Sequence, residues 1–158
     1  MALKKPIKKN SLSKSNLDTR NMVLLTANPV WRAFAKKPVS QKTQTSIGLA
    51  GRMALYALTN GDGQYEHFRE LVVTAHTGIV LAEQGYGYEM LSEFNLALDS
   101  ILACRVRALN GEGYSLREQE GHSVNTLLQL HEEQVQLAEE AELASAIVEG
   151  FQRAQESN

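Results

Sequence analysis

The sequence predicts an all-α protein: an up-and-down bundle of about four long helices, preceded by a short helix and a disordered basic N-terminal arm. From residue 40 onward apolar residues recur at intervals of three or four, and no stretch alternates with a sustained period of two. Proline is absent after Pro38, so long helices are not interrupted. A chain of 158 residues that is 43% apolar suits one domain with a real core. We expect the arm to span residues 1–27 and the helical domain to span residues 28–158.

The first two long helices are predicted over residues 40–59 and 64–84. Ser40 can cap the first of them, because a serine side chain accepts a hydrogen bond from a free backbone N–H of the first turn. Gly48 and Gly51 lower its helix propensity by about 1 kcal/mol each relative to alanine. Together with the alanines nearby they leave a smooth face, on which another helix can pack closely.

The third helix is predicted over residues 88–109 and the last over residues 115–153. Ser115 and Glu118, three residues apart, match a capping box at the start of the last helix. This helix would be much longer than the others, so its apolar end would extend beyond a compact bundle. A second copy of the chain could cover that end, and we therefore expect a homodimer.

Two similar turn sequences separate these helices. Asn-Gly-Asp-Gly over residues 60–63 follows the first long helix, and Asn-Gly-Glu-Gly over residues 110–113 follows the third. Glycine and asparagine commonly end helices in this way. In an up-and-down bundle both turns would lie at the same end.

A short helix is predicted over residues 28–37. Asn28 can cap it, Pro29 suits its first position, and Pro38 ends it. One edge is apolar and carries the chain's single tryptophan beside several cations; these residues are Val30, Trp31, Arg32, Phe34, Lys36 and Lys37. Two explanations are open: the aromatic side chains attach this helix to the bundle, or they contact a partner.

The charge is distributed unevenly along the chain. Residues 1–42 carry ten cations and one acid, whereas residues 43–158 carry six arginines and 17 acids. Three explanations of the basic segment are open: it binds nucleic acid phosphates, it docks on an acidic protein surface, or it is a solvated tail near its own acidic body. The candidate residues for partner or nucleic-acid binding are Lys4, Lys5, Lys8, Lys9, Trp31, Arg32, Phe34, Lys36 and Lys37.

No motif for catalysis, metal or cofactor binding is present in the sequence. The four histidines lack the Glu-x-x-His spacing of di-iron bundles, and none forms a zinc-protease motif. The single cysteine, Cys104, lies in an apolar helical run, where we expect it to be buried. A lone cysteine excludes an intramolecular disulfide, which favours a reducing compartment such as the cytoplasm.

These observations predict a non-enzymatic helical binding protein without cofactors. It would act as an adaptor, inhibitor or regulator through protein–protein contacts, a class that includes accessory proteins of phages and plasmids. The alternative is a nucleic-acid-binding regulator that uses the basic N-terminal segment. A membrane association is not expected, because no apolar run approaches the roughly 18 residues of a membrane span.

Overall fold

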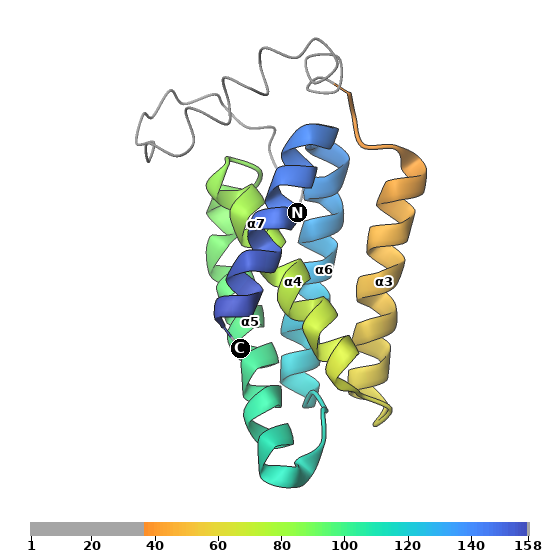
Figure 1. Cartoon of the computed structure of the whole chain (residues 1–158), viewed down its shortest axis with the longest axis vertical. Helices are drawn as coiled ribbons and strands as arrows, with labels where there is room; N and C mark the ends of the chain where they lie inside the picture. The colour runs from red at the N-terminus through yellow and green to blue at the C-terminus, as the bar shows by residue number, and fades with distance from the viewer. Residues whose placement is uncertain (1–36, 158) are drawn as a thin grey trace.

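The computed structural model describes residues 37–157, which form a bundle of five α-helices (Figure 1). The helices are α3 (Gln41–Thr59), α4 (Tyr65–Glu83), α5 (Leu91–Arg107), α6 (Glu118–Leu137) and α7 (Glu140–Glu156). A 3-10 turn (Tyr88–Met90) precedes α5 and a π-helical turn (Ala108–Glu112) follows it. Helices α3 to α6 run alternately down and up, and α7 descends again beside them. The predicted all-α, up-and-down bundle is confirmed.

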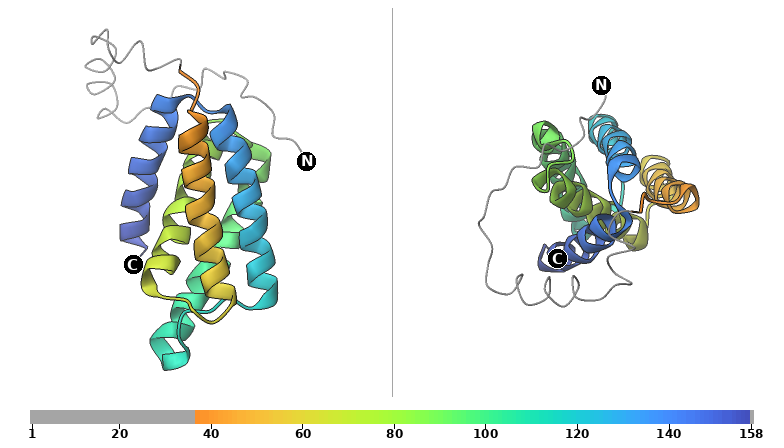
Figure 2. Two further views of the ribbon diagram at one scale, coloured as in Figure 1. Left: turned by 90° about the vertical axis from the view of Figure 1, so that its right-hand side faces the viewer. Right: turned by 90° about the horizontal axis from the view of Figure 1, so that it is seen from above.

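Part of the predicted organisation lies outside the described residues. The basic arm over residues 1–27 does so entirely, and of the short helix over residues 28–37 only Lys37 is described. Lys37 belongs to a short extended stretch that leads into α3. This stretch lies at the same end of the bundle as the connection between α6 and α7 (Figure 2).

Helix α4 is the centre of the bundle and contacts each of the other four α-helices. Every residue from Thr74 to Ala82 is buried, so this part of α4 is enclosed on all sides. Such a helix needs apolar or small residues around its whole circumference, and the sequence supplies them. The other helices bury one face each and expose the opposite one.

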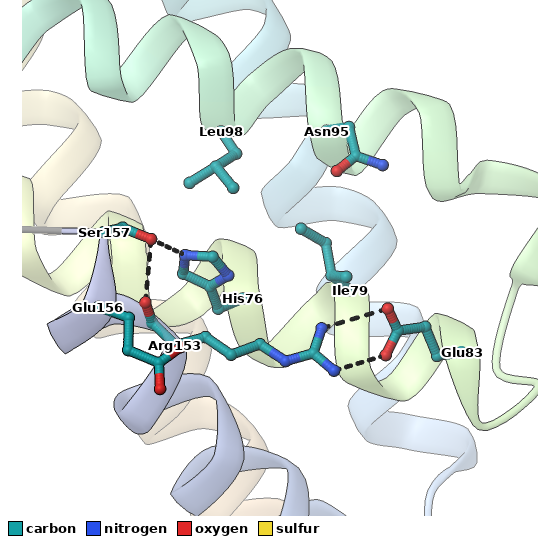
Figure 3. A pocket seen from close by; sticks show the side chains of 8 residues that line it. All are labelled: His76, Ile79, Glu83, Asn95, Leu98, Arg153, Glu156 and Ser157. Atoms are coloured by element: carbon teal, nitrogen blue, oxygen red, sulfur yellow. Dashed lines mark hydrogen bonds and ion pairs between the residues drawn. The ribbon is translucent and has the colours of Figure 1, made fainter.

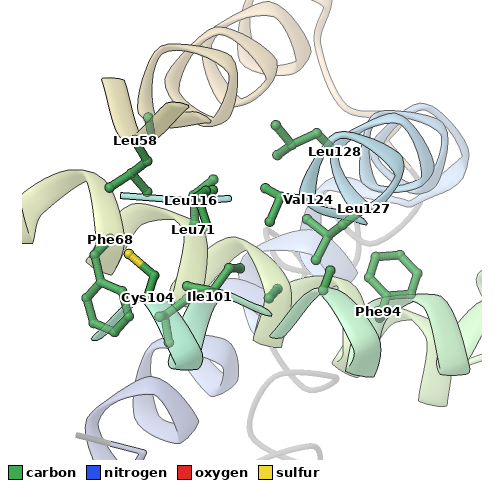
Figure 4. Close-up of a cluster of buried hydrophobic side chains, with 14 of the residues drawn as sticks. Leu58, Phe68, Leu71, Phe94, Ile101, Cys104, Leu116, Val124, Leu127 and Leu128 are labelled. Carbon is green, nitrogen blue, oxygen red and sulfur yellow. The ribbon is translucent and has the colours of Figure 1, made fainter. Parts of the chain in front are cut away.

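The buried side chains form two clusters. The larger one lies between α3, α4, α5 and α6 (Figure 4), and its fully buried members include Leu58, Phe68, Phe94 and Leu127. Cys104 belongs to this cluster and is fully buried, which confirms the expectation from the sequence. The smaller cluster lies where α7 begins; its buried residues are Val39, Val80, Leu81, Tyr86, Val135, Ala138, Leu143 and Ala146.

Two local predictions about α3 are confirmed. The Ser40 hydroxyl accepts a hydrogen bond from the backbone N–H of Thr43 at 3.2 Å, so serine caps the helix. A Cβ atom at Gly51 would lie 2.7 Å from the Leu128 side chain, which is closer than side chains pack. The glycine face of α3 therefore allows the close approach of α6.

The two glycine-rich turns lie at the same end of the bundle, as predicted. The backbone N–H of Leu116 donates to the carbonyl of Leu58 at 2.8 Å, which joins the segments that flank the two turns. A Cβ atom at Gly63 would lie 1.9 Å from the carbonyl oxygen of Tyr114. Glycine is therefore required there for the two backbones to approach.

The prediction of one long helix over residues 115–153 is wrong, because this segment forms α6 and α7. Ala138 and Glu139 have extended backbone angles, with ψ of 153° and 151°, and they end one helix before the next begins. The start is also later than predicted: Arg117 caps α6, and its N–H donates to the Glu120 carboxylate at 2.8 Å. Folding back at Glu139 lets α7 cover α4, which a continuous helix would leave exposed.

This break removes the reason given for a homodimer. The end of the last segment packs on α4 of the same chain and does not extend beyond the bundle. The sequence did contain a signal for the break: Glu139, Glu140 and Glu142 form an acidic group of the kind that favours the first turn of a helix. The dimer itself stays a prediction.

Candidate interaction surface

Lys37 is the only predicted binding residue among the described ones. Its ammonium group lies 3.4 Å from the Glu140 carboxylate, and its carbonyl accepts a hydrogen bond from the Glu140 N–H at 2.8 Å. Pro38 forms an antiparallel bridge with Glu139. Lys37 is therefore held at the start of α7. The other predicted residues lie outside the described range: Lys4, Lys5, Lys8, Lys9, Trp31, Arg32, Phe34 and Lys36.

An exposed apolar stripe runs along the outer side of α3. It consists of Leu49, Met53 and Tyr56, which are 57%, 61% and 68% exposed. Their spacing of four and three residues places them on one side of the helix, opposite the buried face. We call these three residues the α3 face.

The α3 face is almost free of charge. Helix α3 contains no acidic residue, and its cations are Lys42 in the first turn and Arg52. Arg52 is turned toward α6, where its guanidinium donates to the Glu132 carboxylate at 2.9 Å and to the Asn125 side chain at 2.6 Å. A large apolar stripe without charges is unusual on the surface of a soluble domain and is typical of a protein-binding surface.

A second exposed apolar stripe lies on α7. It consists of Ala144, Ile147, Val148 and Phe151, of which Val148 is the most exposed at 59%. The guanidinium of Arg69 lies over the Phe151 ring, 4.9 Å from its centre, and covers one end of the stripe. We call these four residues the α7 face.

Exposed apolar side chains also occur on α5 and in the turn after it, where Val106 and Leu109 are 60% and 72% exposed. Leu96 on α5 is as exposed as the members of the α3 face, at 59%, but its neighbours on the outer side of the helix are the exposed Asn95 and Asp99. Single exposed leucines are ordinary surface residues. Leu96 therefore offers a matched control for substitutions on either face.

A depression lies between α4, α5 and α7 (Figure 3). It has a volume of about 450 Å³ and is open to solvent. Arg153 crosses it and holds Glu83 through two hydrogen bonds of 2.8 and 3.2 Å. Hydrogen bonding to Glu83 raises the pKa of Arg153. Because the pair connects α4 to α7, it serves the fold.

The same depression contains a serine and a histidine in contact. The Nε2 atom of His76 lies 3.1 Å from the Ser157 hydroxyl, an arrangement that nucleophilic catalysis also uses. However, the Ser157 hydroxyl donates its proton to the Arg153 carbonyl at 2.9 Å, so it is not available for activation. Burial and the charge of Arg153 lower the pKa of His76, which favours the neutral ring. The pair is therefore best explained as a link between α4 and the end of α7.

The buried polar groups also have structural partners. Gln134 is fully buried in α6; its amide donates to the carbonyls of Gly78 and Tyr86 at 2.9 and 2.8 Å, and its oxygen lies 3.2 Å from Nδ1 of His131. Burial lowers the pKa of His131, which favours the neutral ring, and because the Gln134 oxygen can only accept, Nδ1–H of His131 is the donor. The Tyr86 hydroxyl donates to Glu142, which joins the turn after α4 to α7.

Arg107 and Glu120 form an ion pair between α5 and α6, with a hydrogen bond of 2.8 Å. Burial opposes ionisation of Glu120, but hydrogen bonds from Arg107 and from the Arg117 backbone outweigh it and lower the pKa of the carboxyl. The Arg107 guanidinium also donates to the Ser115 carbonyl at 2.9 Å. The pair thereby stabilises the connection between these two helices.

Among residues 37–157, no group of three or more histidine, cysteine, aspartate or glutamate side chains is placed to hold a metal ion. None of the five helices of this part of the chain combines the length and apolar character needed to cross a bilayer.

Comparison of the whole chain with protein family models, curated proteins and solved structures finds no match.

The α3 face was not predicted, although the sequence contains a signal for it. Leu49, Met53 and Tyr56 form a second apolar stripe, separate from the one that builds the core. A helix at the edge of a bundle normally has charged residues on that side. The lack of acidic residues throughout Gln41–Thr59 was the feature that could have revealed it.

Proposed function

We propose that this protein is a non-enzymatic binding protein and that its α3 face contacts an apolar, largely uncharged surface of another protein. The observation that carries the proposal is the exposure of Leu49, Met53 and Tyr56 on a helix without acidic residues. Burial of three such side chains at an interface is favourable, and apolar anchors commonly dominate the binding energy.

The arrangement of the polar groups supports a binding role over an enzymatic one. In the part of the chain that the structure describes, ion pairs and hydrogen bonds between titratable side chains connect helices to one another, and the side chains in the open depression, Arg153, Glu83 and His76, take part in these links. Arg153 with Glu83, Arg107 with Glu120, and Tyr86 with Glu142 are the clearest pairs.

The proposal predicts how binding responds to salt. Because the α3 face has little charge, the affinity for a protein partner should change little with ionic strength. Binding of nucleic acid by the basic N-terminal segment would behave differently, since its affinity falls steeply as salt rises. That second function is supported by the ten cations and single acid of residues 1–42.

Affinity capture from a native lysate, with and without nuclease, tests the two functions. We expect a protein partner that survives nuclease and is lost when Leu49, Met53 and Tyr56 are replaced together by glutamine. The matched control Leu96→Gln should retain the partner. Each anchor residue should contribute about 2 kcal/mol, so the triple variant should lose binding below detection.

A different result would contradict the proposal. If the captured material disappears with nuclease and when Lys4, Lys5, Lys8 and Lys9 are replaced by glutamine, the nucleic-acid function is favoured. If the triple variant changes only the mass in solution, the α3 face contacts a second copy of the chain. Sedimentation of both proteins at the same concentrations distinguishes that outcome.

A further inference from the structure

We infer that residues 28–36 of the same chain pack on the α7 face, with Trp31 and Phe34 against Ile147 and Val148. The proposal concerns a different surface from the α3 face and does not depend on the proposed function. It chooses between the two explanations that the sequence left open for the aromatic residues of this segment.

The first argument is the place and direction in which the described chain begins. The Lys37 carbonyl accepts the hydrogen bond of the Glu140 N–H at 2.8 Å, and Pro38 pairs with Glu139 in an antiparallel bridge. In an antiparallel pair, a residue before one partner faces a residue after the other. Traced backward from Pro38, the chain at Lys37 therefore points toward the first turn of α7.

The second argument is reach. Trp31 is six residues before Lys37, which corresponds to roughly 9 Å in a helix and at most about 20 Å in an extended chain. Ile147 is seven residues after Glu140, or roughly 10 Å along α7. Phe34 would then lie near the level of Ala144. The apolar residues of the segment can therefore reach the α7 face without any additional linker.

The third argument is chemical complementarity. Val30, Trp31 and Phe34 supply a large apolar edge, and the α7 face is an exposed apolar stripe at the distance that this edge reaches. Residues 28–37 contain three cations and no acid, whereas α7 contains four glutamates and one arginine. The smaller core cluster already continues to Val39, so packing of the preceding residues extends an existing contact.

The single tryptophan allows a direct test in the full-length protein. We expect the emission of Trp31 to lie at shorter wavelength than in the urea-unfolded chain, and quenching by iodide to be severalfold weaker. Replacing Ile147 and Val148 together by glutamine should abolish both effects. Phe34→Ala should do the same without altering the bundle itself.

The matched control is the pair Leu49→Gln and Met53→Gln on the α3 face, which should leave the emission of Trp31 unchanged. Circular dichroism and the urea midpoint verify that each variant is folded. The proposal is overturned if Trp31 in the native chain is as accessible to iodide as in urea. It is also overturned if the α3 pair, and not the α7 pair, exposes Trp31, or if shielding increases with protein concentration, which would indicate packing between two copies.

Discussion

Replacing Gln134 by leucine should destabilise the protein far more than the same replacement two residues away. Gln134 is fully buried, and its amide donates to the carbonyls of Gly78 and Tyr86, while its oxygen accepts from His131. Leucine fills a similar volume but forms none of these hydrogen bonds. Gln136 on the same helix is exposed, so Gln136→Leu is the matched control.

The expected loss follows from the groups that remain without a partner. The Gly78 carbonyl lies inside α4 and keeps a helical hydrogen bond. The Tyr86 carbonyl and the His131 N–H lose their partner in a buried site, and each such group costs about 1–3 kcal/mol. Part of this is offset by burial of a more apolar side chain. We therefore expect a decrease in the free energy of unfolding of about 3 kcal/mol.

Urea denaturation followed by circular dichroism measures this effect. A loss of about 3 kcal/mol corresponds to a decrease in Tm of about 6–12 °C for a protein of this size. Replacing His131 by leucine as well should cost less than the sum of the two single changes, because the unpaired donor is then removed. If Gln134→Leu and Gln136→Leu have the same urea midpoint, the network does not stabilise the fold and our reasoning is refuted.

Two further predictions concern helix packing and pH. Gly150→Ala should destabilise the protein by about 2 kcal/mol or more, because the new Cβ would lie 2.5 Å from Oγ1 and 2.7 Å from N of Thr77. Gly48→Ala should instead stabilise the protein by up to about 1 kcal/mol, because its Cβ would meet only the flexible end of the Glu132 side chain at 3.4 Å. Equal thermal midpoints of these two variants would contradict the close packing of α7 on α4. Burial in the folded state lowers the pKa of His131 below its usual value, so the unfolded chain binds more protons as the pH falls through the ordinary histidine range. Stability should therefore be full above about pH 7 and decrease as pH falls from there. The free energy of unfolding should change by no more than about 1.4 kcal/mol per pH unit because of this group, and this pH dependence should be weaker in His131→Leu. An unchanged urea midpoint between pH 7.5 and 5.5 in the native chain would show that the fold does not keep His131 neutral.

The helices whose ends have local chemical signals could be predicted from the sequence. Ser40 caps α3 through its own side chain, and the glycine-rich turns at residues 60–63 and 110–113 end helices by backbone conformation. These effects involve residues within one or two turns of each other. They can therefore be predicted from the local sequence and do not depend on the rest of the fold.

The break at Ala138 and Glu139 was predicted wrongly because apolar periodicity continues on both sides of it. Helix propensity and the apolar stripe are compatible with a continuous helix or with two. The choice depends on burial of Leu143, Ala146, Gly150 and Ala154 against α4, a contact between residues that are far apart in the sequence. The free energy of that tertiary contact cannot be predicted from a local sequence pattern.

The candidate surfaces also depend partly on the local sequence and partly on the tertiary packing. The sequence by itself determined that Leu49, Met53 and Tyr56 share one side of a helix, because their spacing fixes their direction relative to the axis. Only the tertiary structure decided that α4 and α6 cover the opposite side and leave this one exposed. Likewise, the sequence shows an acid-rich last segment, but only the tertiary structure pairs Pro38 with Glu139 in an antiparallel bridge at the start of α7. The physical reason is that a residue's direction on its helix is local, whereas its exposure depends on which other helices pack there.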